Sequence, residues 1–135
     1  MAIKVGDAAS ASKLITDEDV RAYAELVGDR NSIHLDEEFA RRTPFGRRIA
    51  HGMYVASLIS SVIAEQLPGP GSVYLGQTLQ FLAPVFLDDT VTARVTVSKM
   101  REDKPIITLE TLCLNQHGET VIKGEAVVKT VTSDK

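Results

Sequence analysis

The sequence predicts an α+β fold in which an antiparallel sheet wraps around one long, buried helix. Residues 52 to about 67 are apolar around most of a helical circumference, which is typical of a helix buried on nearly all sides. After the Pro-Gly-Pro-Gly break at residues 68–71, the apolar period changes to the alternation that is typical of strands. Successive strands joined by short polar turns favour an antiparallel sheet that buries one face against the helix.

Four strands are predicted in this second half of the chain. They are residues 72–81, 90–100, 106–114 and 121–131. Alternation is clearest in the second of them, where one face carries Val91, Ala93, Val95 and Val97. Polar residues at 101–104 and a hairpin turn at 115–118 separate the last three strands. One helix cannot cover the sheet and its edges, so we expect a homodimer that continues the sheet or shares a cleft.

Length, charge and cysteine usage exclude several classes of protein. The 135 residues suit one domain, 1–135, with a single core. A net charge of −3 gives no general attraction to nucleic acid or to anionic membranes. No apolar run reaches membrane-spanning length, the N-terminus lacks the apolar core of a signal peptide, and Cys113 is the only cysteine. We therefore expect a cytoplasmic protein that binds neither nucleic acid nor membrane.

The first part of the chain predicts a short strand followed by a helix. The strand could occupy residues 9–15. Thr16 is a favourable N-cap, and the acidic residues after it lie where the helix dipole stabilises them. Apolar residues then recur at helical spacing as far as Gly28, which can end the helix in a left-handed conformation. Asp29 is therefore expected just beyond a helix end, where the backbone geometry holds it.

A second, short helix is predicted to begin at Asp36, with Phe39 and Ala40 facing inward. It cannot continue far, because Pro44 and Gly46 follow. Four arginines surround this break: Arg41, Arg42, Arg47 and Arg48. Exposed arginines usually form a solvated surface. Arginine also matches phosphate oxygens geometrically, however, so Arg47 and Arg48 are candidates for binding the phosphates of an anionic ligand.

The residues between the two predicted helices carry the candidate chemistry. Asp29, Asn31 and His34 bring an acid, an amide and an imidazole within six residues, shortly before the buried helix. Each of them alone is more simply a turn former or a structural histidine. Apolar neighbours raise the proton affinity of a carboxylate and lower that of an imidazole. Both groups are thereby brought nearer to neutrality, which suits proton transfer. The backbone N–H of Gly52, at the start of the buried helix, could stabilise a developing negative charge.

Two other chemistries are weaker. Asp29, His34 and His51 could offer a carboxylate and two imidazoles to a metal ion. The separation of the two histidines matches no helical ligand pair, and the glycine after His51 indicates a role for the backbone. We therefore rank a metal site well below acid–base chemistry and predict no metal. Nucleophilic catalysis is weaker still, because the helix serines lack a strand-to-helix elbow and Cys113 lies in a predicted strand.

Residues 29–36, Asp-Arg-Asn-Ser-Ile-His-Leu-Asp, are similar to the hydratase 2 motif of the MaoC-like hot-dog family. The resemblance covers most of the chain and includes His51-Gly52-Met53, Leu75-Gly76-Gln77, Pro84-Val85 and residues 101–105. The length is similar to that of the short (R)-specific enoyl-CoA hydratases. The family usually has proline where this chain has Ser32, which affects the stiffness of the turn and not the catalytic groups.

The resemblance implies a hot-dog fold and a dimer with acyl-CoA sites at or near its interface. Asp29 would match the catalytic aspartate, His34 the catalytic histidine, and the N–H of Gly52 the oxyanion donor. Ser60 would match a serine that hydrogen-bonds the aspartate, and Asn31 would shape the turn. The implied substrate is an acyl-CoA thioester, with no cofactor.

The implied activity is the reversible syn hydration of trans-2-enoyl-CoA to (3R)-3-hydroxyacyl-CoA, which links fatty acid β-oxidation to the supply of polyhydroxyalkanoate precursors. Dehydration of (3R)-hydroxyacyl groups on acyl carrier protein stays open, because the four arginines could contact an acidic carrier. A catalytically silent acyl-CoA binding module also stays open, although Asp29 and His34 are both present. A thioesterase of this fold usually carries its acid within the central helix, where this chain has only Glu65.

Overall fold

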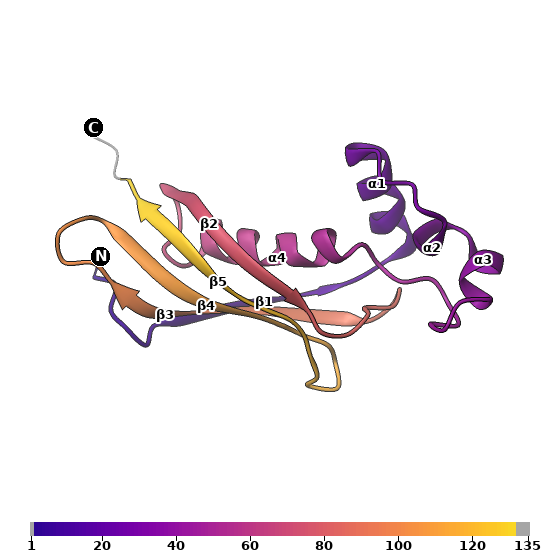
Figure 1. The fold of residues 1–135 in the computed structure, drawn as a ribbon. Helices are drawn as coiled ribbons and strands as arrows, with labels where there is room; N and C mark the ends of the chain where they lie inside the picture. Colours follow the sequence, from indigo (N-terminus) through magenta and orange to yellow (C-terminus); the bar gives the residue numbers. More distant parts are fainter. Residues whose placement is uncertain (1, 132–135) are drawn as a thin grey trace.

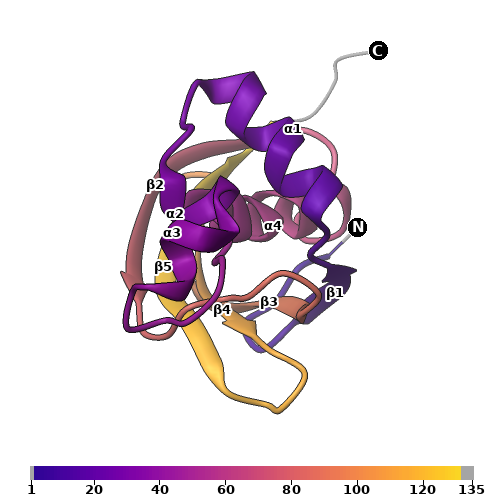
Figure 2. The same ribbon diagram turned by 90° about the vertical axis from the view of Figure 1, so that its right-hand side faces the viewer.

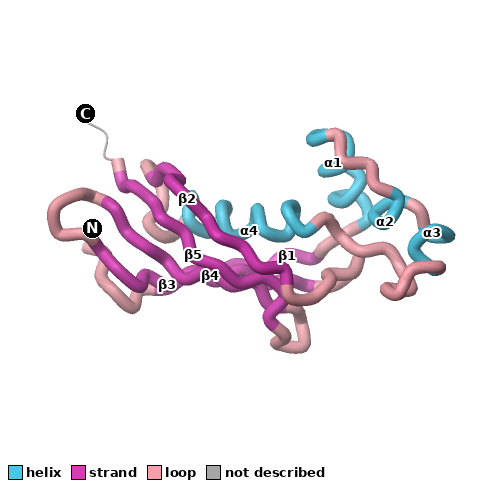
Figure 3. Tube along the Cα trace, in the orientation of Figure 1, coloured by secondary structure: helices cyan, strands magenta, loops and turns pink. Residues whose placement is uncertain are grey.

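The computed structural model describes residues 2–131 and confirms the predicted class of fold. A five-stranded antiparallel sheet curves around the long helix α4 (Gly52–Glu65), as Figures 1 and 2 show from two directions. The strands are β1 (Ala8–Leu14), β2 (Ser72–Phe81), β3 (Thr90–Met100), β4 (Ile106–Leu114) and β5 (Thr120–Thr130). Three shorter helices, α1 (Asp17–Val27), α2 (Ser32–Leu35) and α3 (Glu37–Arg41), gather beyond the N-terminal end of α4 (Figure 3).

The sheet has the order β1-β3-β4-β5-β2. The predicted meander therefore holds for β3, β4 and β5 but not for β2. That strand pairs with β5, with Thr78 opposite Glu125, so that β1 and β2 become the two edges of the sheet. The chain therefore crosses from β2 at one edge to β3, which lies beside β1 near the other edge.

The core forms where α4 meets the inner face of the sheet. The helix buries Val55, Ala56, Ile59, Val62 and Ile63. The four apolar residues predicted on one face of β3 are all buried as well. The prediction was wrong for Met53, which is 57% exposed because it lies in the first turn of α4, at the open end of the core. The helix also ends at Glu65, slightly before the predicted limit, and Leu67 remains buried beyond it.

The short helices end and begin at the residues that their capping chemistry favours. Thr16 Oγ1 accepts from the Asp19 N–H over 3.0 Å, and Gly28 ends α1 with a φ of 80°. Asp36 caps α3 as predicted, but Phe39 is 41% exposed and only Ala40 is buried. The intervening α2 was not predicted. Within residues 2–131, no helix is both long and apolar enough to cross a membrane.

Candidate active site

Asp29 lies in the short connection between α1 and α2, with its carboxylate exposed. Its Oδ1 accepts from the Asn31 N–H over 3.3 Å. Asn31 in turn caps α2, because its Oδ1 accepts from the Ile33 N–H over 3.1 Å. Ser32 is the first residue of α2, where a proline would be tolerated because this N–H has no intrahelical partner. These contacts give the turn its shape without a proline at position 32.

His34 lies on α2 and is only 9% exposed. Its Nδ1 is 2.8 Å from the carbonyl oxygen of Ile49, which is fixed by a bridge between Ile49 and Phe86. Because a carbonyl oxygen only accepts, Nδ1 carries the proton and Nε2 presents a lone pair. Burial lowers the pKa of His34 below its ordinary value, an effect that the Ile49 hydrogen bond opposes and nearby His51 reinforces. The uncharged imidazole is thereby favoured.

His51 precedes α4 and is 2% exposed. Its Nε2 is 3.0 Å from the main-chain carbonyl oxygen of Asp29. Its ring stacks on that of His34, with centroids 3.8 Å apart and planes inclined by 29°. Sequence reasoning gave His51 only a possible place in a metal site or a backbone role. Its position beside both Asp29 and His34 depends on the tertiary fold, and its presence in the His-Gly-Met motif was the only signal.

The same three side chains form a compact cluster that resembles a metal site. Candidate ligand atoms of Asp29, His34 and His51 all lie within 4.8 Å of one another. Two ring nitrogens already donate to carbonyls, however: Nδ1 of His34 to Ile49 and Nε2 of His51 to Asp29. The lone pairs that face the opening are then those of the Asp29 carboxylate and of His34 Nε2. Two such acceptors suit the binding of a water molecule and the transfer of its proton better than they suit a metal ion.

Gly52 is the first residue of α4, and no side chain caps this helix end. Its N–H is therefore one of the helix donors that lack an intrahelical partner, at the positive end of the helix dipole. The backbone of Gly52 does not need a positive φ. Its lack of a side chain has another cause, since a Cβ at this position would lie 2.8 Å from Cε1 of Phe81.

Two cavities meet at these residues. One, of about 260 Å³, is lined by Asp29, His34, His51, Gly52, Met53 and Phe81. The other, of about 410 Å³, is mainly apolar and includes Phe45, Ile49, Val55, Leu82 and Ile122. His34, Gly52 and Phe81 belong to both cavities. The polar groups therefore lie at the mouth of an apolar space that could hold a hydrocarbon chain.

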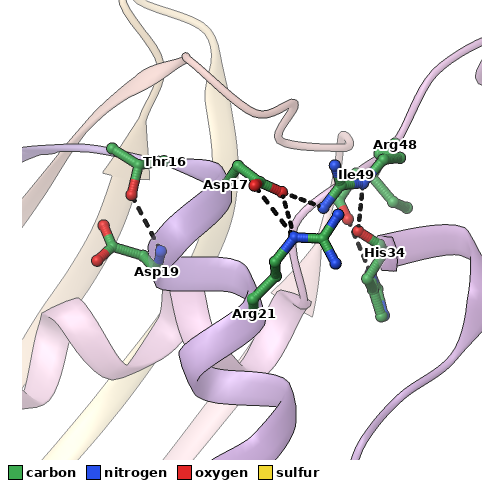
Figure 4. A network of polar contacts seen from close by, with 7 residues as sticks. All are labelled: Thr16, Asp17, Asp19, Arg21, His34, Arg48 and Ile49. Carbon is green, nitrogen blue, oxygen red and sulfur yellow. Dashed lines mark hydrogen bonds and ion pairs between the residues drawn. The ribbon is translucent and has the colours of Figure 1, made fainter. Parts of the chain in front are cut away.

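Arg48 is buried, and Figure 4 shows its guanidinium in contact with Asp17 and with the main chain of His34. Its Nε donates to the carbonyl oxygen of His34 and its Nη2 to Oδ1 of Asp17, both over 2.6 Å. This hydrogen-bonded ion pair holds the pKa of Asp17 below its usual value. Arg48 thus joins α2 to α1. The sequence predicts Arg48 as a candidate for binding phosphates, but its guanidinium is buried and already bonded to these two acceptors.

The other candidate residues lie farther from the centre of the site. Arg47 is exposed, and its guanidinium carbon lies 3.9 Å above the ring of Phe86. Ser60 is two turns along α4 from Gly52 and is half-buried. Within residues 2–131, no hydrogen bond joins Ser60 to Asp29. The bond implied by the family resemblance is therefore not formed within one chain.

An antiparallel sheet around a central helix, with an acid and an imidazole at the start of that helix, defines a MaoC-like hot-dog domain. Residues 4–116 match the family model described as "MaoC like domain", and the chain belongs to this family. It is 51% identical to the (R)-specific enoyl-CoA hydratase of Aeromonas caviae over 127 residues, which cover 94% of this chain and 95% of the relative.

Two further comparisons agree with that assignment. The chain is 48% identical to the 3-hydroxybutyryl-CoA dehydratase of Methylorubrum extorquens, over 94% of this chain and 80% of the relative. A solved structure of the (R)-hydratase from A. caviae involved in PHA biosynthesis superposes with a TM-score of 0.94 at 50% identity, covering 96% of this chain and 98% of that one. The comparison establishes the hot-dog fold for nearly the whole chain.

Proposed function

We propose that this protein is an (R)-specific enoyl-CoA hydratase, a hydro-lyase that adds water reversibly to trans-2-enoyl-CoA. The observation that carries the proposal is that Asp29 and His34, whose carboxylate and Nε2 can each accept a hydrogen bond, line one cavity with Gly52 at the uncapped N-terminus of α4. The names of the relatives at about half identity over nearly the whole chain support the same activity. The enoyl-CoA substrate would come from fatty acid β-oxidation. The product, a (3R)-hydroxyacyl-CoA, would supply polyhydroxyalkanoate synthesis.

In the proposed reaction, one water molecule is held between Asp29 and His34. The water oxygen bonds to C3 of the enoyl group while Asp29 takes a proton from the water. The electrons of the double bond move toward the thioester, whose oxygen becomes negative. The N–H of Gly52 stabilises this oxygen, and such a donor contributes about 3 kcal/mol. The proton then passes from the Asp29 and His34 pair to C2, on the face that received the hydroxyl group.

The apolar cavity of about 410 Å³ supports an acyl substrate. Its opening is shared with His34 and Gly52, so a chain lying inside it would present its first carbons to the polar groups. Each buried methylene contributes about 0.8 kcal/mol to binding. The rim residue Leu82 is 54% exposed, while the floor residues Val55 and Ile122 are almost fully buried. The cavity is therefore closed at its inner end and would favour a chain of limited length.

The contacts of the arginines give little support for an acyl carrier protein as a partner. Arg41 pairs with Glu38, and Arg48 pairs with Asp17. Arg42 and Arg47 remain exposed, beside the acidic residues Glu37 and Glu38. This surface has little net positive charge with which to attract the acidic surface of a carrier protein.

The test is hydration by purified protein, measured as the loss of enoyl absorbance. We expect turnover of crotonyl-CoA, slower turnover of a long-chain enoyl-CoA, and much slower turnover of the same enoyl group on acyl carrier protein. Activity should survive treatment with a chelator, because the proposed chemistry uses no metal. Activity that is abolished by the chelator, or a strong preference for the carrier-bound thioester, would overturn the proposal.

We also propose a homodimer that forms at the β2 edge. This strand has a neighbour on one side only, and most of its side chains are exposed. Among them are Val73, Tyr74, Leu75 and Phe81, each at least 38% exposed. An apolar edge strand of this kind is a surface for pairing with a second copy. Sedimentation at micromolar concentration should give the mass of a dimer, and a monomer alone would contradict this proposal.

We propose the cytoplasm as the place of action. Its support is the single cysteine, Cys113, whose thiol is buried and whose pKa is raised by burial to about 12. Such a thiol has no partner for a disulfide and little thiolate at neutral pH. Fractionation of the producing cells should recover the protein with cytoplasmic enzymes, and its recovery with exported proteins would contradict this localisation.

A further inference from the structure

His51 is in contact with each of the three residues that the proposed reaction uses. It is joined to Gly52 by a peptide bond, it is hydrogen-bonded to the main chain of Asp29, and its ring is stacked on His34. The side chain is 2% exposed, although it lines the smaller of the two cavities. Its Nε2 is bonded to the Asp29 carbonyl and its Nδ1 is buried, so its contacts with neighbouring residues are the route by which it can act on the reaction.

The hydrogen bond to Asp29 fixes a residue that secondary structure does not hold. Asp29 lies between the end of α1 and the start of α2, and its carboxylate is exposed. Within residues 2–131, the donor to its carbonyl oxygen is Nε2 of His51, over 3.0 Å. Because this carbonyl only accepts, Nε2 carries the proton. The ring's other nitrogen, Nδ1, is buried and has no hydrogen-bond partner among the described residues. The bond to the Asp29 carbonyl is therefore the hydrogen bond that this imidazole makes within residues 2–131.

The stack fixes the second catalytic group. The His51 ring contacts two aromatic rings, that of His34 with centroids 3.8 Å apart and that of Tyr23 with centroids 4.8 Å apart. The His34 ring is already tied at Nδ1 to the Ile49 carbonyl. A second constraint on its face determines the direction in which Nε2 points. Removal of the His51 ring would also open the face of His34 to water.

We propose that His51 is a positioning residue, which holds the Asp29 carboxylate and the His34 ring at a fixed separation from the N–H of Gly52. This inference rests on the proposed hydratase activity for its kinetic consequences. It concerns the arrangement of the groups and not the transfer of a proton by His51 itself. A displacement of about 1 Å in such an arrangement can lower turnover about 100-fold.

Two substitutions separate the two contacts. His51→Phe keeps an aromatic ring against His34 but removes the N–H that binds Asp29. His51→Gln keeps an amide N–H that can reach the Asp29 carbonyl but removes the ring. The matched control is His117→Gln, at an exposed position in the turn between β4 and β5. Thermal melts establish that each variant is folded, and the glutamine variant retains a readout if phenylalanine does not fit.

We expect His51→Phe to lower kcat by up to about 100-fold with little change in KM, because the acyl cavity is untouched. His51→Gln should retain at least about tenfold more turnover than His51→Phe, because Asp29 stays anchored. Wild-type turnover in the phenylalanine variant would overturn the proposal. Equal losses in the two variants, with KM raised in both, would also overturn it, since they would indicate general damage to the fold.

An NMR titration of the His34 ring gives a second readout that does not depend on activity. The groups that act on His34 are the Ile49 carbonyl and the side chains of His51, Asp29 and Arg48, and Tyr23 contacts the His51 ring. Burial lowers the pKa of His34, so the glutamine variant, which admits water, should raise this pKa toward 6.5. The phenylalanine variant should leave it low. An unchanged titration in His51→Gln would contradict the stacking role even if wild-type protein showed no hydratase activity.

Discussion

Asp29→Asn and His34→Ala should each lower turnover of crotonyl-CoA by about 100-fold or more, which is the scale of lost acid–base catalysis. Asparagine preserves the size of the Asp29 side chain and its oxygen for the Asn31 N–H, but an amide cannot take a proton from water. Alanine at His34 removes the ring nitrogen Nε2, which remains free to accept a hydrogen bond when Nδ1 donates to Ile49. The loss should appear in kcat more than in KM, because neither side chain forms the floor of the acyl cavity.

Folding is the main control for this pair of variants. Asp29 is exposed and its variant should melt like wild type, whereas the His34 side chain is only 9% exposed and lines both cavities. His34→Ala should therefore melt at a lower temperature and still fold, since Arg48 binds the main chain of His34 and not its ring. Asp36→Asn is a matched control, because asparagine caps a helix as well as aspartate. Near-normal turnover in a folded Asp29 or His34 variant would remove that residue from the mechanism.

Loss of the Gly52 N–H should lower turnover by about 10²–10³-fold, the effect of removing one oxyanion donor. Proline at the first position of a helix is compatible with the fold. The preceding residue, His51, has φ −61° and ψ 129°, the extended conformation that a following proline requires. Proline also introduces a Cβ, however, and this atom would approach Phe81 to 2.8 Å. A direct comparison with the wild type would therefore mix two effects.

The comparison is cleaner in a background that makes room for the Cβ. In Phe81→Ala protein, Gly52→Ala and Gly52→Pro have the same Cβ and differ in the N–H. The alanine double variant should be close in turnover to Phe81→Ala alone, and the proline double variant should be about 10²–10³-fold slower. Thermal melts must show that both fold. A folded proline variant that is as fast as its alanine partner would show that another group holds the oxyanion.

The fold was predictable where one pattern controls a whole element. The alternation in β3 and the apolar circumference of α4 determine which residues are buried, and both elements lie where the pattern indicated. Single positions at the ends of elements were less predictable. Met53 and Phe39 satisfy a helical period, but they lie where the core is open. The pairing of β2 with β5 depends on a long-range choice that no local pattern encodes.

The site shows the same division. The spacing of Asp29, His34 and Gly52 indicated a common site, and the fold brings all three to one cavity. The roles of His51 and Arg48 depend on contacts with residues more than a dozen positions away. Arg48 in particular is of a residue type that usually lies at the surface, and its burial is explained by its bonds to Asp17 and to the His34 carbonyl. Sequence alone identifies such residues as charged or polar without identifying their partners.

The configuration of the product tests the central claim most directly. The claim is that one pair of side chains delivers both the hydroxyl group and the proton from a single face of the substrate. Hydration of crotonyl-CoA in D₂O by the purified protein should give (3R)-3-hydroxybutyryl-CoA with deuterium at C2 on the same face as the hydroxyl group, as measured by NMR coupling constants and by chiral analysis. A (3S) product, or deuterium on the opposite face, would contradict the arrangement of Asp29, His34 and Gly52 proposed for this site.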